Sequence, residues 1–347
     1  MKLLKKFGYI ALASVMTLSL VACSTDKKET GKEEPKTNET AGNTEAATGI
    51  AKVGLGAVAS VGSSKAYGEK DGAAQADNTI VAAAFDKDGK IVSVKIDVAQ
   101  SKVEVKMDGS LGDIPEFKTK KELGPDYGMV GASKIGKEWF EQAQALEEKL
   151  VGKTVDEVKA LAVEDNKLTD ADFTSSVTIK VNDYFAALEK AWNNAVDAAG
   201  AEKISLGVNT TADKSKAAAE DKGASVQFDT VYALTAVDKD GKIVKVILDT
   251  LQDKVEFNAD GTLAEVKEIK SKKELGDEYG MKGASKIGKE WFEQAAALED
   301  YFVGKTLDDV KGLGIDEEQH VTDEALKSSV TIKVPGYQAV LVEALEK

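Results

Sequence analysis

Two copies of a hydroxyl-rich motif are the chemically most suggestive feature of the chain. The motif Ser175-Ser176-Val177-Thr178 recurs as Ser328-Ser329-Val330-Thr331. Apolar residues alternate with hydroxyl residues, and Lys180 or Lys333 follows on the same face, which predicts a strand with a polar side. Such a strand could simply be a sheet edge exposed to water. Its hydroxyls are also groups that a modifying enzyme could reach.

A glycine-rich turn before a helix is the second repeated motif. Its paired residues are Glu122 and Glu274, Gly124 and Gly276, Gly128 and Gly280, Gly131 and Gly283, and Ser133 and Ser285. Glycine lets the backbone approach a flat or phosphorylated ligand, and a helix N-terminus attracts anions. Ser133 is equally well placed to cap the following helix. A ligand-binding turn and a plain capped turn therefore both remain open.

Composition excludes several other chemistries. The 347 residues include one cysteine, Cys23, and one histidine, His320. Internal disulfides and zinc fingers are therefore excluded, and the single histidine argues against a multi-histidine metal centre. His320 has no counterpart in the other copy, so a repeated function cannot depend on it. All 46 basic residues are lysines, against 60 acidic residues, for a net charge of −14. This balance argues against a nucleic-acid surface.

One unit is written twice in the chain. An offset of 152 residues superimposes long stretches, and the segment GASKIGKEWFEQA at residues 131–143 recurs unchanged at residues 283–295. The period fits a whole domain rather than a solenoid repeat. We expect two similar, separately folding domains, at residues 51–198 and 199–347.

Each unit is expected to be α+β. Alternating residues around Asp-Lys-Asp-Gly predict hairpins at residues 79–98 and 230–251. An apolar stripe predicts a helix over residues 134–150, with Trp139 in the core, as is expected of Trp291 in the copy. Thr154 begins a capping box, and Asn182 or Asp183 should cap a further helix that runs through residue 195, with Pro335 at the matching start in the copy.

The N-terminus resembles a lipoprotein signal. Lysines precede an apolar stretch at residues 7–21, and the ending Leu20-Val-Ala-Cys23 resembles a bacterial lipobox, in which the cysteine is diacylated after cleavage. We expect residues 1–22 to be the signal peptide and residues 23–50 to be an acylated, disordered tether. The protein would then lie at the outer face of the bacterial cytoplasmic membrane. A plain secretory signal with an incidental cysteine is the alternative.

Taken in order, the motifs resemble a known family. Each unit resembles the FMN-binding domain of flavin-carrying subunits of sodium-pumping quinone reductases and related electron-transfer complexes. The resemblance rests on residues 122–128, 138–142, 151–153 and 175–178, together with their copies. Two such domains behind a lipobox resemble the flavinylated lipoproteins of Gram-positive extracellular electron transfer, of the pheromone-lipoprotein type. The sequence departs from the family in two places: Ser-Val replaces Gly-Ala, and Asp170 lies eight residues before Thr178 instead of six.

This resemblance implies a function. In the family, a flavin transferase joins FMN to the last threonine of the motif through a phosphoester, which corresponds here to Thr178 and Thr331. The serines of that motif and the residues of the glycine turn would help to bind the cofactor, and Ser133 and Ser285 are rival attachment points. The protein would be an electron-transfer flavoprotein rather than a conventional enzyme. It would relay electrons from a membrane quinol or NADH dehydrogenase system to an external acceptor such as ferric iron.

A second function class fits the N-terminal signal equally well. A solute-binding or adhesion lipoprotein would explain the lipobox, the tether and the acidity, but not the motifs that recur in both halves. A released signal-peptide tail ending at Ala22 could in addition act as a peptide pheromone, as in the family. Colour separates the two classes, because a flavoprotein is yellow.

Overall fold

The computed structural model describes residues 49–347, which form an α+β protein, as expected. The signal peptide, Cys23 and all but the last two residues of the predicted tether lie outside the described residues. Within residues 49–347, no helix has the length and apolar character that a membrane span needs.

The first half contains three long strands followed by short and long helices. In chain order its elements are β1 (Lys52–Ser60), β2 (Gly72–Phe85), β3 (Ile91–Val105), α1 (Lys120–Leu123), η1 (Gly124–Tyr127), η2 (Val130–Ala132), α2 (Trp139–Leu150), α3 (Val155–Lys159), β4 (Val163–Glu164), β5 (Lys167–Leu168), α4 (Ala171–Thr174), α5 (Asn182–Asn193) and β6 (Val196–Asp197).

The second half repeats the order of the three long strands and of the α-helices, but η2, β4, β5 and β6 have no counterparts in it. Its elements are β7 (Lys203–Thr211), β8 (Ser225–Val237), β9 (Ile243–Glu256), α6 (Lys272–Leu275), η3 (Gly276–Tyr279), α7 (Trp291–Phe302), α8 (Leu307–Lys311), α9 (Glu324–Lys327) and α10 (Pro335–Glu346).

Each half builds its own antiparallel sheet. The strand orders are β3-β2-β1-β6 and β7-β8-β9, while β4 and β5 form a separate small hairpin. The hairpins predicted at residues 79–98 and 230–251 are confirmed as β2–β3 and β8–β9. In the first, Asp86 Oδ1 accepts hydrogen bonds from the backbone N–H groups of Asp88 and Lys90, and Gly89 adopts a φ of 78°. These bonds close the turn that sets the strand register.

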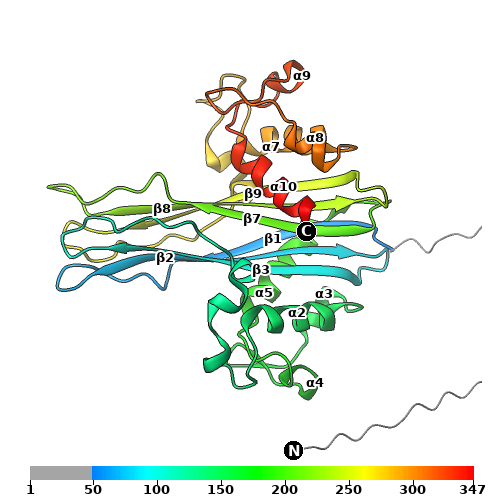
Figure 1. The fold of residues 1–347 in the computed structure, drawn as a ribbon, viewed down its shortest axis with the longest axis horizontal. Coiled ribbons are helices and arrows are strands. Elements are labelled where there is room, and N and C mark those ends of the chain that lie inside the picture. The colour runs from blue at the N-terminus through cyan, green and yellow to red at the C-terminus, as the bar shows by residue number, and fades with distance from the viewer. Residues whose placement is uncertain (1–48) are drawn as a thin grey trace, which may run out of the picture. The chain divides into compact units, whose positions relative to one another are not determined.

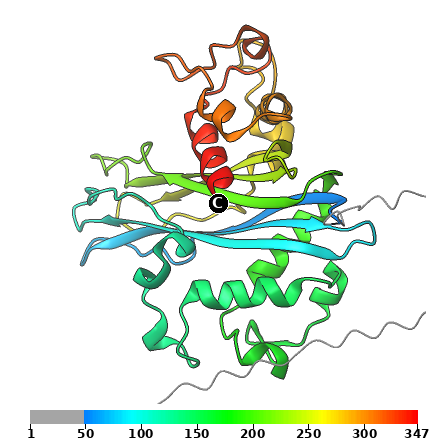
Figure 2. The same ribbon diagram turned by 45° about the vertical axis from the view of Figure 1, so that its right-hand side comes forward.

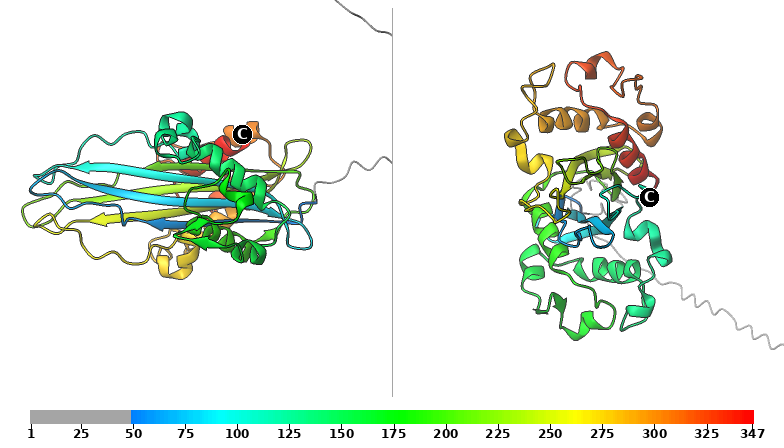
Figure 3. Two further views of the ribbon diagram at one scale, coloured as in Figure 1. Left: turned by 90° about the horizontal axis from the view of Figure 1, so that it is seen from below. Right: turned by 90° about the vertical axis from the view of Figure 1, so that its left-hand side faces the viewer.

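The sheets pack against each other on one face and carry helices on the other, as Figures 1 and 2 show. Alternate residues of β2 divide between two cores: Val81, Ala83 and Phe85 pack under the helices of their own half. Ile80, Ala82 and Ala84 instead share a core with residues of the second half. The end view in the right panel of Figure 3 shows the paired sheets between the two helical layers. Helices therefore cover opposite outer faces of one sandwich.

Glycine lets the long C-terminal helix of each half approach its sheet closely. A Cβ atom at Gly54 would lie 1.8 Å from the carbonyl oxygen of Ala191 on α5. In the second half, a Cβ atom at Gly207 would lie 2.0 Å from the carbonyl oxygen of Val340 on α10. Any larger residue at these positions would push the helix off the sheet.

The two halves, which we expected to be separate domains, share apolar cores. Residues 49–347 belong to one compact unit, and a second apolar cluster also draws residues from both halves, among them Val103 and Phe228. The halves share the order of their three long strands and their α-helices, and each has a separate sheet. Independent folding of residues 51–198 and 199–347 stays a prediction.

Two local predictions are wrong. The helix predicted from residue 134 begins instead at Trp139 with Glu138 as its N-cap, because Gly136 adopts a φ of 62° that interrupts the chain after Ser133. The segment 175–181 is not a strand. Val177 and Val181 are buried against the helical layer, while the backbone N–H of Thr178 donates to a side chain rather than to a neighbouring strand. The alternation of apolar residues thus reflects packing of an extended loop.

The other helix predictions hold. Thr154 caps α3 in a capping box with Glu157, and α5 begins at Asn182. The N-cap of α5 is Val181, however, rather than Asn182 or Asp183. In the second half, α10 begins at Pro335 as expected. Trp139 and Trp291 are 2% and 1% exposed, so both are core residues.

A buried polar pair joins the two sheets. The Nδ2 atom of Asn78 on β2 donates to Oδ2 of Asp253 on β9 at 2.5 Å and to Oγ1 of Thr230 at 3.0 Å. Asn78 and Asp253 are both 0% exposed, and the Oδ1 atom of each lacks a hydrogen-bond partner. Burial raises the pKa of Asp253 to about 7. Protonation of Asp253 would supply the donor that Oδ1 of Asn78 lacks.

We predict that Asp253→Asn stabilises the protein more strongly as pH rises. Because the folded-state pKa is raised, the stability contributed by Asp253 is full below the unfolded pKa of about 3.9 and is lost as pH rises through about 7. An amide cannot ionise, and it can donate to Asn78. Between pH 5 and pH 8, the stability gain over wild type should grow by roughly 3 kcal/mol, measured by denaturant unfolding.

The exposed Asp240→Asn variant is the matched control and should show no such growth. A constant difference between Asp253→Asn and wild type at both pH values would contradict the prediction.

Candidate functional site

The glycine turn is held by the side chain of one buried glutamate. Glu138, at the start of α2, accepts hydrogen bonds from the backbone N–H groups of Met129 at 2.8 Å and Val130 at 3.0 Å. Glu290 does the same for Met281 and Lys282, both at 2.8 Å. Two charge-assisted bonds therefore fix the turn onto the first turn of the helix.

Most of the predicted turn residues shape the backbone. Gly124 and Gly128 have φ values of 50° and 74°, and Gly276 and Gly280 have the same values. These are conformations that glycine adopts without strain. Glu122 closes a capping box with Thr119, as Glu274 does with Ser271. Glu274 also forms an ion pair with Lys190 of the other half, 2.6 Å apart.

Gly131 and Gly283, the last glycines of the two turns, do not need to be glycine for their backbone conformation or for space. Neither Gly131 nor Gly283 is among the positive-φ glycines, and a Cβ atom at either would meet nothing within 4 Å. Both lie on exposed backbone beside the predicted serines.

One glutamine brings the two predicted hydroxyl positions of the first half together. Gln142 on α2 is 0% exposed, and its Nε2 donates to Oγ of Ser133 at 3.1 Å. Its Oε1 accepts from the backbone N–H of Thr178 at 2.8 Å and from the Thr178 hydroxyl at 3.1 Å. The amide thus joins the turn, the helix and the segment that carries the threonine.

The second half repeats this arrangement. Gln294 is also 0% exposed and donates to Oγ of Ser285 at 3.1 Å. It accepts from the backbone N–H and the hydroxyl of Thr331, at 2.7 Å and 3.2 Å. All four hydroxyl residues are half-buried, so each retains access to solvent.

The remaining predicted serines lie apart from this bridge. Ser175 follows α4 as its C-cap, and the hydroxyl of Ser176 donates weakly to the carbonyl of Phe173 at 3.4 Å. Ser328 donates to the carbonyl of Ala325 at 3.1 Å, and the backbone N–H of Ser329 donates to Leu326. These bonds finish the short helices α4 and α9. The aspartates Asp170 and Asp323 cap the same helices at their N-termini.

A cavity of about 970 Å³ opens beside the bridge of the second half. Ser285 and Thr331 line it, together with the aromatic rings of Tyr279, Trp291 and Tyr337 and the ammonium of Lys272. Ligand pockets typically measure roughly 300–1,000 Å³ and combine apolar walls with a few polar groups. Of these aromatic residues only Tyr279 is half-buried, and its ring, the lysines and the half-buried Thr331 would suit a flavin with its phosphate.

Each half contains one buried, hydrogen-bonded pair of a tryptophan and a tyrosine. The Nε1 of Trp139 donates to the Tyr184 hydroxyl at 2.9 Å, and Trp291 donates to Tyr337 at the same distance. Burial raises the pKa of Tyr337 to about 12, so this hydroxyl is neutral at physiological pH. Burial raises the pKa of Tyr184 further.

In both halves a lysine ammonium lies over the ring of the buried tryptophan and over the ring of a second tyrosine. The Lys272 ammonium lies 5.0 Å from the Tyr279 ring centroid and 5.2 Å from that of Trp291. Lys120 has the same relation to Tyr127 and Trp139, at 4.8 Å and 5.5 Å. Burial lowers the pKa of Lys272 to about 8. A cation that is partly desolvated at the cavity wall is suited to an anionic ligand group.

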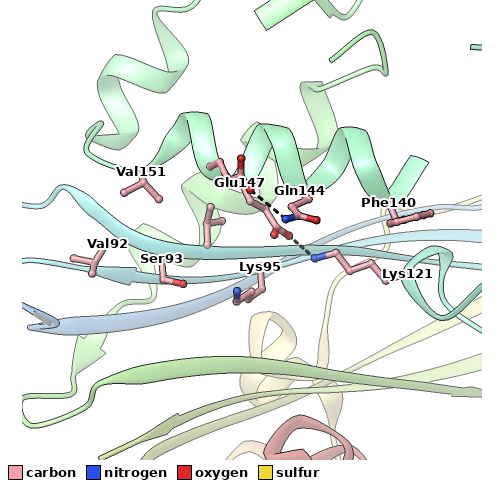
Figure 4. A pocket seen from close by; sticks show the side chains of 10 residues that line it. Val92, Ser93, Lys95, Lys121, Phe140, Gln144, Glu147 and Val151 are labelled. Carbon is pink, nitrogen blue, oxygen red and sulfur yellow. Dashed lines mark hydrogen bonds and ion pairs between the residues drawn. The ribbon is translucent and has the colours of Figure 1, made fainter. Parts of the chain in front are cut away.

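Figure 4 shows a separate cavity of about 470 Å³ between β3 and α2. Glu147 extends from the helix, and its Oε1 accepts from the backbone N–H of Ile96 at 2.6 Å and from Lys121 at 2.5 Å. Glu299 repeats this contact with Leu248 and Lys273. The carboxylate of Glu147 therefore accepts a hydrogen bond from a free backbone N–H of the edge strand β3. This contact prevents a strand of another chain from pairing there. This makes the cavity a structural feature rather than a reaction site.

Sequence reasoning did not identify Gln142, Gln294, Lys120 or Lys272. The available signal was the identity of residues 131–143 and 283–295, which contain both glutamines. A polar residue on an otherwise apolar helix face would have marked them further. Among residues 49–347, no group of three or more His, Cys, Asp or Glu residues could hold a metal ion.

Comparison with known proteins gives one local likeness. The chain is 40% identical to a chlorophenol reductase of Desulfitobacterium hafniense over 94 residues, which cover 23% of this chain and 29% of that protein. No family model matches the sequence. No solved structure matches either. The chain thus spans less than a third of the curated relative, and the likeness does not establish a family.

We predict that Lys272→Met removes a pH-dependent part of the protein's stability. The folded-state pKa of about 8 lies below the unfolded value, so wild type gains stability as pH rises from 8 toward 10. Methionine cannot titrate and should lack a gain of about 2 kcal/mol between pH 7.5 and 9.5, measured by denaturant unfolding. The exposed Lys239→Met variant should follow wild type. A Lys272→Met profile that parallels wild type would overturn the assignment.

Proposed function

We propose that the chain is a lipid-anchored flavoprotein with FMN joined covalently to Thr178 and Thr331. It would relay electrons at the outer face of the cytoplasmic membrane, from a quinol or NADH dehydrogenase system to an external acceptor such as ferric iron. The observation that carries this proposal is the same hydrogen bond in both halves, from the threonine hydroxyl to the side-chain oxygen of Gln142 or Gln294.

The direction of the hydrogen bonds supports threonine over serine as the attachment point. The oxygen of Ser133 already accepts from the backbone N–H of Lys137 at 3.2 Å and from Gln142 at 3.1 Å. The hydroxyl of Thr178 instead donates to Gln142, and no donor among residues 49–347 occupies its oxygen lone pairs. A lone pair that is not engaged by N–H groups is the better nucleophile.

The surroundings of Thr331 suit a flavin phosphoester. Lys333 and Lys272 line the same cavity and offset phosphate charge. The threonine also lies a few residues before the N-terminus of α10, where the helix dipole favours an anion. The half-buried Tyr279 offers a flat surface to the ring, while Trp291 supports it from the core. Bound FMN would supply the redox chemistry, while these residues bind it, orient it and limit its contact with water.

The repeated order of elements supports a second part of the proposal. Each half, with its own sheet, helical layer and bridged hydroxyls, would be one FMN-binding domain, so that one chain carries two flavins. The two sites lie under separate helical layers on opposite faces of the sandwich (Figure 1). The partial likeness to a reductase covers too little of either protein to decide between electron relay and solute binding.

We predict FMN adducts on two peptides of protein made together with its flavin transferase. One adduct should fall on the peptide that contains Thr178 and one on the peptide that contains Thr331. Thr178→Ala should remove the first adduct and leave the second, and Thr331→Ala should do the reverse. Peptide mass mapping with absorbance near the flavin bands measures both.

Each half serves as the control for the other in the same molecule. An adduct on the peptide of Ser133 or Ser285 would move the attachment site. Colourless protein without any adduct would defeat the covalent mechanism and favour a solute-binding role.

We further predict that Cys23→Ala releases the protein from the membrane fraction. Two acyl chains anchor a protein firmly, whereas the unacylated chain would rely on an acidic surface that anionic lipids repel. Cell fractionation followed by immunoblotting measures the distribution, with Cys23→Ala compared to wild type at equal expression. Retention of the variant in the membrane fraction would exclude the lipid anchor.

A further inference from the structure

We propose that Gln142 and Gln294 are the positioning residues that select the threonine, rather than the neighbouring serine, for covalent flavin attachment. This inference rests on the proposed function and adds the residue that controls where modification occurs. It follows from how each amide is fixed, from what it does to the two hydroxyls it joins, and from its inability to take a proton.

The amide can adopt only one orientation. Nε2 of Gln142 donates to the carbonyl of Lys137 at 3.2 Å, and Oε1 accepts from the backbone N–H of Thr178 at 2.8 Å. A flipped amide would oppose oxygen to carbonyl and NH₂ to N–H, which would leave buried groups unpaired. Gln294 is fixed in the same way by Lys289 and Thr331, at 3.3 Å and 2.7 Å.

The fixed oxygen then orients the threonine. The same Oε1 accepts from both the backbone and the hydroxyl of Thr178, so the side chain is held in one rotamer with its proton directed at Gln142. The oxygen lone pairs consequently face away from the amide. On Ser133, the amide NH₂ and the Lys137 N–H both occupy the oxygen. One side chain therefore prepares one hydroxyl for attack and suppresses the other.

The reaction itself needs an activated donor, since direct condensation of a phosphate with an alcohol is unfavourable in water. We name as donor a flavin–nucleotide phosphoanhydride bound by the transferase. The threonine Oγ forms a new bond to the flavin phosphorus, and the anhydride P–O bond breaks. The nucleoside monophosphate leaves with that electron pair, and the hydroxyl proton turns from Gln142 about the Cβ–Oγ bond and passes to a base of the transferase.

Gln142 takes no part in this proton transfer, because an amide is not basic at physiological pH. Its contribution is orientation of the nucleophile, which raises the rate of the chemical step. Removal of the amide should therefore lower the turnover rate of the transferase at that threonine more than it changes the Michaelis constant.

The test uses two substitutions at residue 142 in the full chain, with the second half left intact. Gln142→Leu keeps the volume of the side chain and loses every hydrogen bond. Gln142→Glu keeps an acceptor for the Thr178 N–H and hydroxyl, and when its buried carboxyl is protonated it can also donate to the Lys137 carbonyl as the amide does. Both proteins are treated with flavin transferase and donor, and adducts on the Thr178 and Thr331 peptides are followed over time.

We expect the initial rate of modification at Thr178 to fall about tenfold or more in Gln142→Leu, through the turnover rate, and to stay within a few-fold of wild type in Gln142→Glu. Thr331 should be modified normally in both variants, and Gln294→Leu should give the mirror-image result. Modification that shifts to Ser133 in Gln142→Leu would also support the selection role.

Two results would overturn the inference. Wild-type rates at Thr178 in Gln142→Leu would show that the amide is not needed, and equal losses in the Leu and Glu variants would indicate a purely structural role. Thermal unfolding and normal labelling of Thr331 show that the chain is folded. Failure of the proposed function is distinct, because wild-type protein would then carry no adduct on either threonine.

Discussion

The structure depends on the need to cover both faces of each sheet. Residues 80–85 of β2 are all buried, with alternate side chains pointing to opposite sides. The helices of one half can cover only one of these faces, so the other face must be covered by the sheet of the second half. The pairing of the halves follows from this constraint. It also leaves the helical layers, and the two bridged hydroxyl sites, on the outer faces.

The elements with a strong local code were predictable from sequence. The Asp-Gly turns predicted both hairpins correctly, and the Thr154 capping box predicted the start of α3. These signals are readable because they act between neighbouring residues. The shared core was not predictable. A strand buried on both faces shows a continuous apolar run, and such a run does not indicate whether helices or a second sheet supply the cover.

The site was predicted in part, and the missed residues have a common physical reason. Alternation at Val177, Ile179 and Val181 arises from contact with the helical layer, and such contacts imitate a strand pattern. The start of α2 was misplaced because Ser133 is engaged by Lys137 and Gln142 instead of by a first helical turn. Gln142 itself acts across 36 residues of sequence on Thr178, a separation at which local patterns carry no information.

The uneven similarity of the two halves reflects what each segment must do. β1 and β7 occupy equivalent places in their sheets although few of their residues match, because packing requires only apolar side chains of suitable volume. Residues 131–143 and 283–295 are identical. Within them, the serine, the glutamate, the tryptophan and the glutamine each bind a defined partner outside the helix backbone, as Gln142 binds Thr178. A hydrogen bond fixes both the type and the length of the side chain, so a network of such bonds tolerates fewer changes than a core. The unchanged segment therefore coincides with the bridge that holds the threonine hydroxyl, and the packing surfaces around it were free to diverge.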